Sequence, residues 1–194
     1  MNYQNIDTNG NVVIAPDKKY SKSELFENFI EFITYSNFSI VKIFNGSQLP
    51  YHVIIQNENK EWILYFFLKN ITGAGWADKP NIKRVQIKNT SEFNQELIPT
   101  NDKQLLTLFG YYNFDNNPIM VAWDAYRYDH HRTLRSCYVS VNLLQFGYQK
   151  GFCCSVDAGN RLWLFDRYHF KEFLIDYIKY EGEHHHVSNI TKKF

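Results

Sequence analysis

Short apolar runs separated by turn residues recur along the chain, and only three stretches have the spacing of a helix. The first helix is expected over Ser21 to Ser36, because Ser can cap it, Glu24 follows three residues later and apolar residues recur at helical spacing. The second is expected over Tyr138 to Lys150, before a glycine stop at Gly151, and the third over Arg167 to Tyr180. Three helices that do not alternate regularly with strands disfavour a parallel βαβ fold.

The other apolar runs indicate an antiparallel sheet. Strands are expected at Phe38–Phe44, in a hairpin formed by His52–Ile55 and Trp62–Leu68, at Val85–Ile87, and in a last hairpin formed by Phe152–Ser155 and Arg161–Phe165. Further apolar runs cover Leu105–Tyr112 and Ile119–Trp123, whereas Asn70–Pro80 favours a loop. We therefore predict an α+β fold with a mainly antiparallel, curved or barrel-like sheet and flanking helices. The helices at Ser21–Ser36 and Tyr138–Lys150 are expected to cover its openings or one face.

Length and composition fit one globular unit. The chain has 194 residues, of which 44% are hydrophobic, so it can bury a sizeable core. We expect a single domain over residues 1–180 and a polar tail, or the start of a linker, over residues 181–194. Three cysteines, two of them adjacent, favour a reducing compartment, and no window approaches the roughly 20 apolar residues that span a bilayer. A cytoplasmic location without a membrane partner follows.

Motifs for catalysis are weak in this sequence. No phosphate-binding Gly-x-x-x-x-Gly-Lys motif is present, and Gly73-Ala74-Gly75 precedes no predicted helix, so we expect no cofactor. The clustered histidines lack partners at metal-ligand spacing, so no metal is expected either. Glu58-Asn59-Lys60 has the order of a nuclease triplet but falls in a predicted turn. We do not expect catalysis by this chain.

A basic stripe runs from Trp76 to Lys88. The formal net charge is only +1, so a surface for nucleic acids must come from local clustering of this kind. Lysine and arginine can neutralise phosphates, and asparagine and glutamine can contact adenine with two hydrogen bonds. The expected DNA contacts here are Trp76, Lys79, Asn81, Lys83, Arg84 and Gln86. The alternative is a solvated strand edge whose charges prevent pairing with other chains.

A second segment, from Asp124 to Ser136, mixes cationic, aromatic and hydroxyl side chains. Arginine there suits phosphate or guanine contacts, and hydroxyl groups can donate to phosphate. The expected DNA contacts in this segment are Tyr126, Arg127, Tyr128, Arg132, Thr133 and Arg135. The alternative is a surface network in which Asp124 and Asp129 pair with the arginines.

Several stretches of the sequence together resemble a known protein family. They are Lys83-Arg84-Val85-Gln86-Ile87, the run Leu105 to Tyr111, Met120 to Asp124, and Ser136 to Leu144 before Gly151-Phe152. Over roughly residues 60 to 155 the chain resembles the N-terminal DNA-recognition part of LlaJI-type, McrBC-related restriction endonucleases, some of which carry a DNA-binding pseudobarrel. The resemblance implies a site-specific double-stranded DNA-binding module of a restriction-modification system. Its two basic segments would grip the major groove and target a motor or nuclease carried by other domains or subunits.

Two other functions remain open at this point: a metal-dependent restriction nuclease and a protein-interaction domain of a defence system. A DNA affinity that falls as the salt concentration rises would distinguish a DNA-binding module from a protein-interaction domain, because phosphate neutralisation releases counterions.

Overall fold

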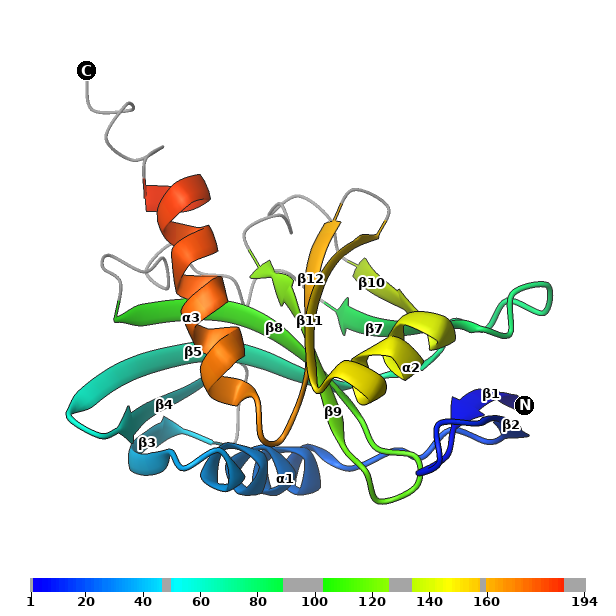
Figure 1. Cartoon of the computed structure of the whole chain (residues 1–194), viewed down its shortest axis with the longest axis horizontal. Helices are drawn as coiled ribbons and strands as arrows, with labels where there is room; N and C mark the ends of the chain where they lie inside the picture. Colours follow the sequence, from blue (N-terminus) through cyan, green and yellow to red (C-terminus); the bar gives the residue numbers. More distant parts are fainter. Residues whose placement is uncertain (1, 47–49, 89–102, 126–133, 158–159, 187–194) are drawn as a thin grey trace.

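The computed structural model describes residues 2–46, 50–88, 103–125, 134–157 and 160–186. A seven-stranded mixed sheet forms the centre, in the order β11-β12-β9-β8-β5-β4-β3 (Figure 1). Its strands are β3 (Ser39–Asn45), β4 (Tyr51–Asn57), β5 (Lys60–Asn70), β8 (Gln104–Tyr112), β9 (Ile119–Asp124), β11 (Phe152–Asp157) and β12 (Asn160–Asp166). All neighbouring strands are antiparallel except β5 and β8, which are parallel.

Two smaller sheets and three α-helices surround this centre. A three-stranded sheet has the order β10-β7-β6, and an N-terminal hairpin pairs β1 with β2. These strands are β1 (Tyr3–Ile6), β2 (Val12–Ala15), β6 (Thr72–Gly73), β7 (Ile82–Lys88) and β10 (Leu134–Ser140). The helices are α1 (Lys22–Tyr35), α2 (Val141–Lys150) and α3 (Phe170–Glu181), which continues into the π-helix η4 (Gly182–His186).

The predicted α+β class is confirmed, and the described strands do not close into a barrel. None of the described helices has the length and apolar character needed to cross a membrane.

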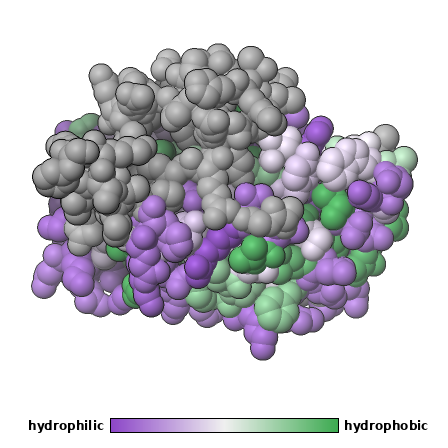
Figure 2. Space-filling model, turned by 90° about the horizontal axis from the view of Figure 1, so that it is seen from above, coloured by the Kyte–Doolittle hydropathy of each residue, from purple (hydrophilic) through white to green (hydrophobic). Residues whose placement is uncertain are grey.

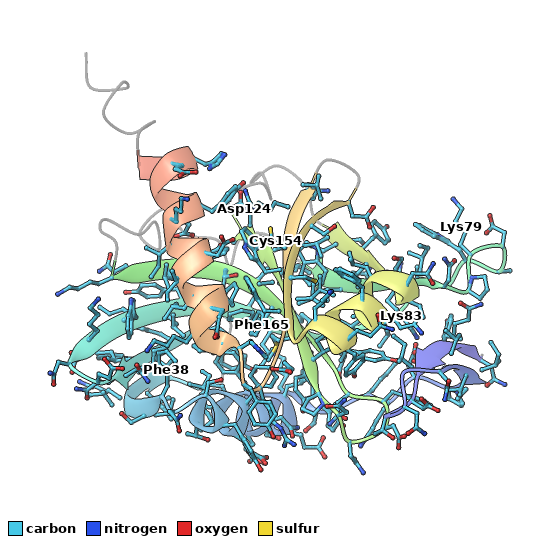
Figure 3. All side chains as sticks on the ribbon, viewed as in Figure 1. Phe38, Lys79, Lys83, Asp124, Cys154 and Phe165 are labelled. Carbon is cyan, nitrogen blue, oxygen red and sulfur yellow. The ribbon has the colours of Figure 1, made fainter. Side chains whose placement is uncertain are left out.

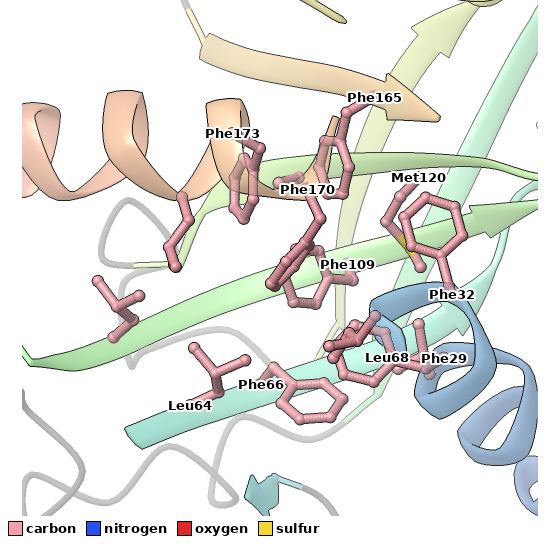
Figure 4. Close-up of a cluster of buried hydrophobic side chains, with 14 of the residues drawn as sticks. Phe29, Phe32, Leu64, Phe66, Leu68, Phe109, Met120, Phe165, Phe170 and Phe173 are labelled. Carbon is pink, nitrogen blue, oxygen red and sulfur yellow. The ribbon is translucent and has the colours of Figure 1, made fainter. Parts of the chain in front are cut away.

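The centre of the sheet is buried on both faces. Residues 105–112 of β8 and all of β9 are buried. On one face, aromatic side chains of the sheet pack against α1 and α3: the rings of Phe29 and Phe66 are 4.2 Å apart, and those of Phe165 and Phe173 are 4.3 Å apart (Figure 4). On the other face, alternate residues of the same strands pack against β7, β10 and α2. The helices α1 and α2 thus lie on opposite faces of the sheet.

The predicted first helix is confirmed together with its cap. The backbone N–H of Glu24 donates to the Ser21 hydroxyl at 3.3 Å, and the N–H of Ser21 donates to the Glu24 carboxylate at 2.7 Å. This reciprocal arrangement satisfies two N–H groups that the helix end leaves free. Both predicted hairpins are confirmed as well.

Other boundaries differ from the prediction. Residues 138–140 belong to strand β10 and not to the second helix, because Tyr138 and Val139 pair with β7, and the helix starts after Ser140, whose hydroxyl caps it. The third helix starts at Phe170, three residues later than predicted. The predicted loop at residues 70–80 contains the short strand β6, and the N-terminal hairpin was not predicted at all.

A buried ion pair joins the N-terminal segment to the small sheet. The Lys83 side chain is fully buried, and its ammonium group contacts the carboxylate of Asp17 and donates to Asn5 Oδ1 at 2.8 Å. The second oxygen of Asp17 accepts the N–H of Gly73 at 2.6 Å. A Cβ atom at Gly73 would lie only 2.2 Å from the ring of Tyr3, so this close approach requires glycine. Burial lowers the pKa of Lys83, and Asp17 opposes that shift.

We expect Asp17→Ala to lower the free energy of unfolding by about 3–5 kcal/mol, because it leaves a buried ammonium group without its counter-charge. The double variant Asp17→Ala/Lys83→Met should recover much of this loss, since it removes the orphaned charge. Asp78→Ala, which alters an exposed carboxylate, is the matched control and should stay within about 0.5 kcal/mol of wild type. Urea unfolding at neutral pH measures all three. A loss for Asp17→Ala no larger than that of the control would contradict the structural role of this pair.

Candidate nucleic-acid interface

The outer face of the three-stranded sheet carries a row of polar and aromatic side chains. Along β7, Val85 and Ile87 are buried, whereas Arg84 and Gln86 are partly exposed, as alternation across a strand requires. Arg84 lies opposite Tyr138 on β10, and Gln86 lies opposite Ser136. Opposed residues of an antiparallel pair share a face. The four side chains therefore form two cross-strand pairs on the side that faces away from the central sheet.

An aromatic stack extends this face at one end. The ring of Trp76, 40% exposed, stacks on Tyr138 with the centroids 5.1 Å apart and the planes 26° apart. The ammonium group of Lys79 lies 5.5 Å from the Trp76 centroid, within the range of a cation–π contact. Figure 3 shows Lys79 at the periphery of the molecule, beyond the sheet. The structure thus brings Trp76, Lys79, Arg84 and Gln86 to one surface.

Tyr138 belongs to this surface and was missed by the sequence analysis. The signal was the alternation of Cys137 and Val139, both buried, with the more polar Ser136, Tyr138 and Ser140. This period of two indicates a strand, but the stretch was assigned to the following helix.

The prediction for Lys83 is wrong. Its side chain lies on the inner face of β7, with Val85 and Ile87, and is fully buried against Asp17 and Asn5. An ammonium group in this position cannot reach a phosphate. Asn81 is partly exposed, and its backbone carbonyl accepts the N–H of Val141 at 2.8 Å, which fixes the start of α2 beside the small sheet.

The second predicted segment falls mostly outside the described residues. Tyr126, Arg127, Tyr128, Arg132 and Thr133 lie there, and for Arg135 only the backbone is described, paired with Ile87. The described strands still fix one relation between the two segments. Strand β10 starts at Leu134, which pairs with Lys88, the last residue of the basic stripe. The end of the second segment therefore lies beside the basic stripe. Asp124, offered as an arginine partner, is buried and accepts the hydroxyl of Tyr180 at 3.0 Å.

The surface of the molecule is chemically mixed. Seen from above the molecule, hydrophilic side chains surround smaller hydrophobic patches over the part of the surface that the structure describes (Figure 2). Among the described residues, no group of three or more His, Cys, Asp or Glu side chains is placed to hold a metal ion.

Two buried carboxyl groups meet where β9 and α3 end. Glu181, the last residue of α3, is 1% exposed, and Asp124 is 2% exposed. Burial, together with the charge of Asp124, raises the pKa of Glu181 to about 9, and the Tyr177 hydroxyl partly opposes this shift. Glu181 is therefore protonated at neutral pH, a form that is poor at binding metal ions or accepting protons.

We expect Glu181→Gln to stabilise the fold at neutral pH. The folded state keeps the Glu181 proton up to about pH 9, whereas an ordinary glutamate releases it near 4.5. Stability of the wild type therefore falls as pH rises through this window, and glutamine removes that loss. The variant should match wild type below about pH 4.5 and exceed it by about 3 kcal/mol at pH 7, because each pH unit above 4.5 contributes about 1.4 kcal/mol. Urea unfolding across pH measures this, with exposed Glu183→Gln as the control. A difference between Glu181→Gln and wild type that does not change with pH would rule out the raised pKa.

Comparison with known proteins gives one assignment. Searches of curated proteins and of solved structures return no match. A family model described as methylase-associated X1 matches residues 63–174, more than half of the chain, including β7, β10 and most of the central sheet. The match links the chain to the methylase-associated domains of restriction-modification systems, which is the general context that the sequence resemblance implied. This chain belongs to the methylase-associated X1 family.

Proposed function

We propose that this chain is a double-stranded DNA-binding module of a restriction-modification system. In this role it would target a motor, nuclease or methylase activity of other domains or subunits to a DNA site, as LlaJI-type and McrBC-related recognition domains do. The observation that carries the proposal is the outer face of the small sheet. There Lys79, Arg84 and Gln86 share one surface with the Trp76–Tyr138 stack.

The dimensions of this face support a groove contact. Strands β7 and β10 have seven residues each and pair antiparallel throughout. A strand of this length spans roughly 20 Å, and the major groove admits a two-stranded ribbon. Lys79 and Arg84 would then contact phosphates, while Gln86 and Asn81 present amide groups suited to adenine. The Trp76–Tyr138 stack would hold Lys79 in place, because a cation over an aromatic face is restrained there.

Lys79→Ala and Arg84→Ala should each weaken binding to specific and random duplexes alike. Each should also reduce the slope of log affinity against log salt by about one unit, as the loss of one phosphate contact requires. Fluorescence anisotropy over a salt series measures both effects. Lys171→Ala on α3 is the control, since its ammonium lies 3.3 Å from Glu58 on the other side of the sheet. Wild-type slopes in both variants, or no salt-dependent binding at all, would favour a protein-interaction domain instead.

Arginines of the second segment should affect sequence choice. At least one of Arg127→Ala and Arg132→Ala should cost about 1–3 kcal/mol on the preferred site, because a bidentate guanine contact discriminates by about that amount. The same variant should change binding to random DNA little. The preferred site would come from selection on random and methylated duplexes, followed by competition binding at fixed salt. If both variants bind the preferred site within about twofold of wild type, the segment does not read bases.

A further inference from the structure

A small polar pocket lies on the other side of the central sheet from the proposed DNA surface. Its volume is about 120 Å³, and one stripe of α1, containing Asn28, Glu31, Phe32 and Tyr35, forms one wall. Residues 111–118, at the end of β8 and in its connection to β9, form the opposite wall, and Arg167 closes one side. Because α1 packs on the face opposite β7 and β10, a duplex on the small sheet does not reach this pocket.

Arg167 is held at the pocket by aromatic rings. Its guanidinium group lies 4.2 Å from the ring centroid of Tyr35 and 5.4 Å from that of Tyr168. The Ser36 hydroxyl donates to the Arg167 carbonyl at 2.5 Å, which fixes the backbone. Stacking occupies the face of a guanidinium and leaves its in-plane N–H groups available. Among the described residues, no carboxylate lies within ion-pair distance of this side chain.

The pocket also has one buried acceptor without a donor and one exposed carboxylate. Asn113 donates from Nδ2 to the Tyr111 hydroxyl at 3.3 Å, but its Oδ1 is buried and has no hydrogen-bond partner within the described part of the chain. Glu31 lines the same pocket with a carboxylate that forms no ion pair to Arg167. An acceptor buried without a partner is costly, so each such group in a native fold calls for an explanation. A bound ligand with N–H donors supplies one.

We propose that this pocket binds a small α-amino acid. The ligand carboxylate would accept two N–H groups of Arg167, and its ammonium group would donate to Glu31 and, after a rotation of the Asn113 side chain, to Asn113 Oδ1. The opposite charges of Arg167 and Glu31 disfavour a simple anion or a simple cation, because either would meet one like charge. A cavity of about 150 Å³ accommodates benzene, so this slightly smaller, open pocket suits glycine, alanine or serine and excludes a nucleotide. The proposal does not depend on DNA binding.

Isothermal titration with glycine, L-alanine and L-serine tests this site. We expect at least one of them to bind the full chain with a dissociation constant near or below about 1 mM. The amide of the amino acid that binds, which lacks the carboxylate, and its N-acetyl derivative, which lacks the ammonium, should each bind at least about tenfold more weakly than the amino acid itself.

Variants locate the binding. Arg167→Gln and Glu31→Gln should each weaken it by at least about tenfold. The matched controls are Arg161→Gln on β12 and Glu27→Gln, one turn earlier on the exposed surface of α1, and both should bind within about twofold of wild type. Circular dichroism confirms that every variant is folded. The proposal is overturned if none of the three amino acids binds, or if binding persists unchanged in Arg167→Gln and Glu31→Gln.

Discussion

Burial of β8 and β9 on both faces requires a layer of structure on each side of the central sheet. Helices α1 and α3 supply one layer, and β7, β10 and α2 supply the other. Two-sided burial of this kind is usual for strands at the centre of a layered sheet. Since β7 and β10 use their apolar faces for this packing, their other faces are left to form an outer surface of the molecule. The candidate DNA surface is thus a consequence of how the core is covered.

The small sheet is also tied to the N-terminal segment through polar contacts. Lys83 contacts Asp17 and Asn5 beneath β7, and Asn5 accepts the hydroxyl of Tyr112 from the central sheet at 3.1 Å. One buried charge therefore connects three parts of the chain that are distant in sequence. Such an ion pair adds little net stability compared with apolar packing. Loss of either partner is costly, however, because it leaves a buried charge uncompensated, so the two groups must stay in contact. We infer that it sets the position of β7 and hence of Arg84 and Gln86.

The sequence predicted the local elements well and their spatial relations less well. The capped helix α1 and both hairpins follow from short-range patterns that the structure confirms. The parallel pairing of β5 with β8 joins segments separated by more than thirty residues, and no local pattern specifies it. Lys83 was wrongly predicted to contact DNA, although the strand pattern indicates on which face it lies. Lys83 alternates in step with Val85 and Ile87, and a lysine on the apolar face of a strand needs a buried partner. That partner, Asp17, lies in a segment whose hairpin was not predicted.

The proposed function depends on DNA contact by the outer face of β7 and β10. Amide chemical shifts of the ¹⁵N-labelled chain, followed during titration with a short mixed-sequence duplex at low salt, test it most directly. We expect the largest changes on Trp76, Lys79, Arg84, Gln86 and Tyr138, while residues of α1 change little. Changes concentrated on α1 and α3, or none during the titration, would contradict it.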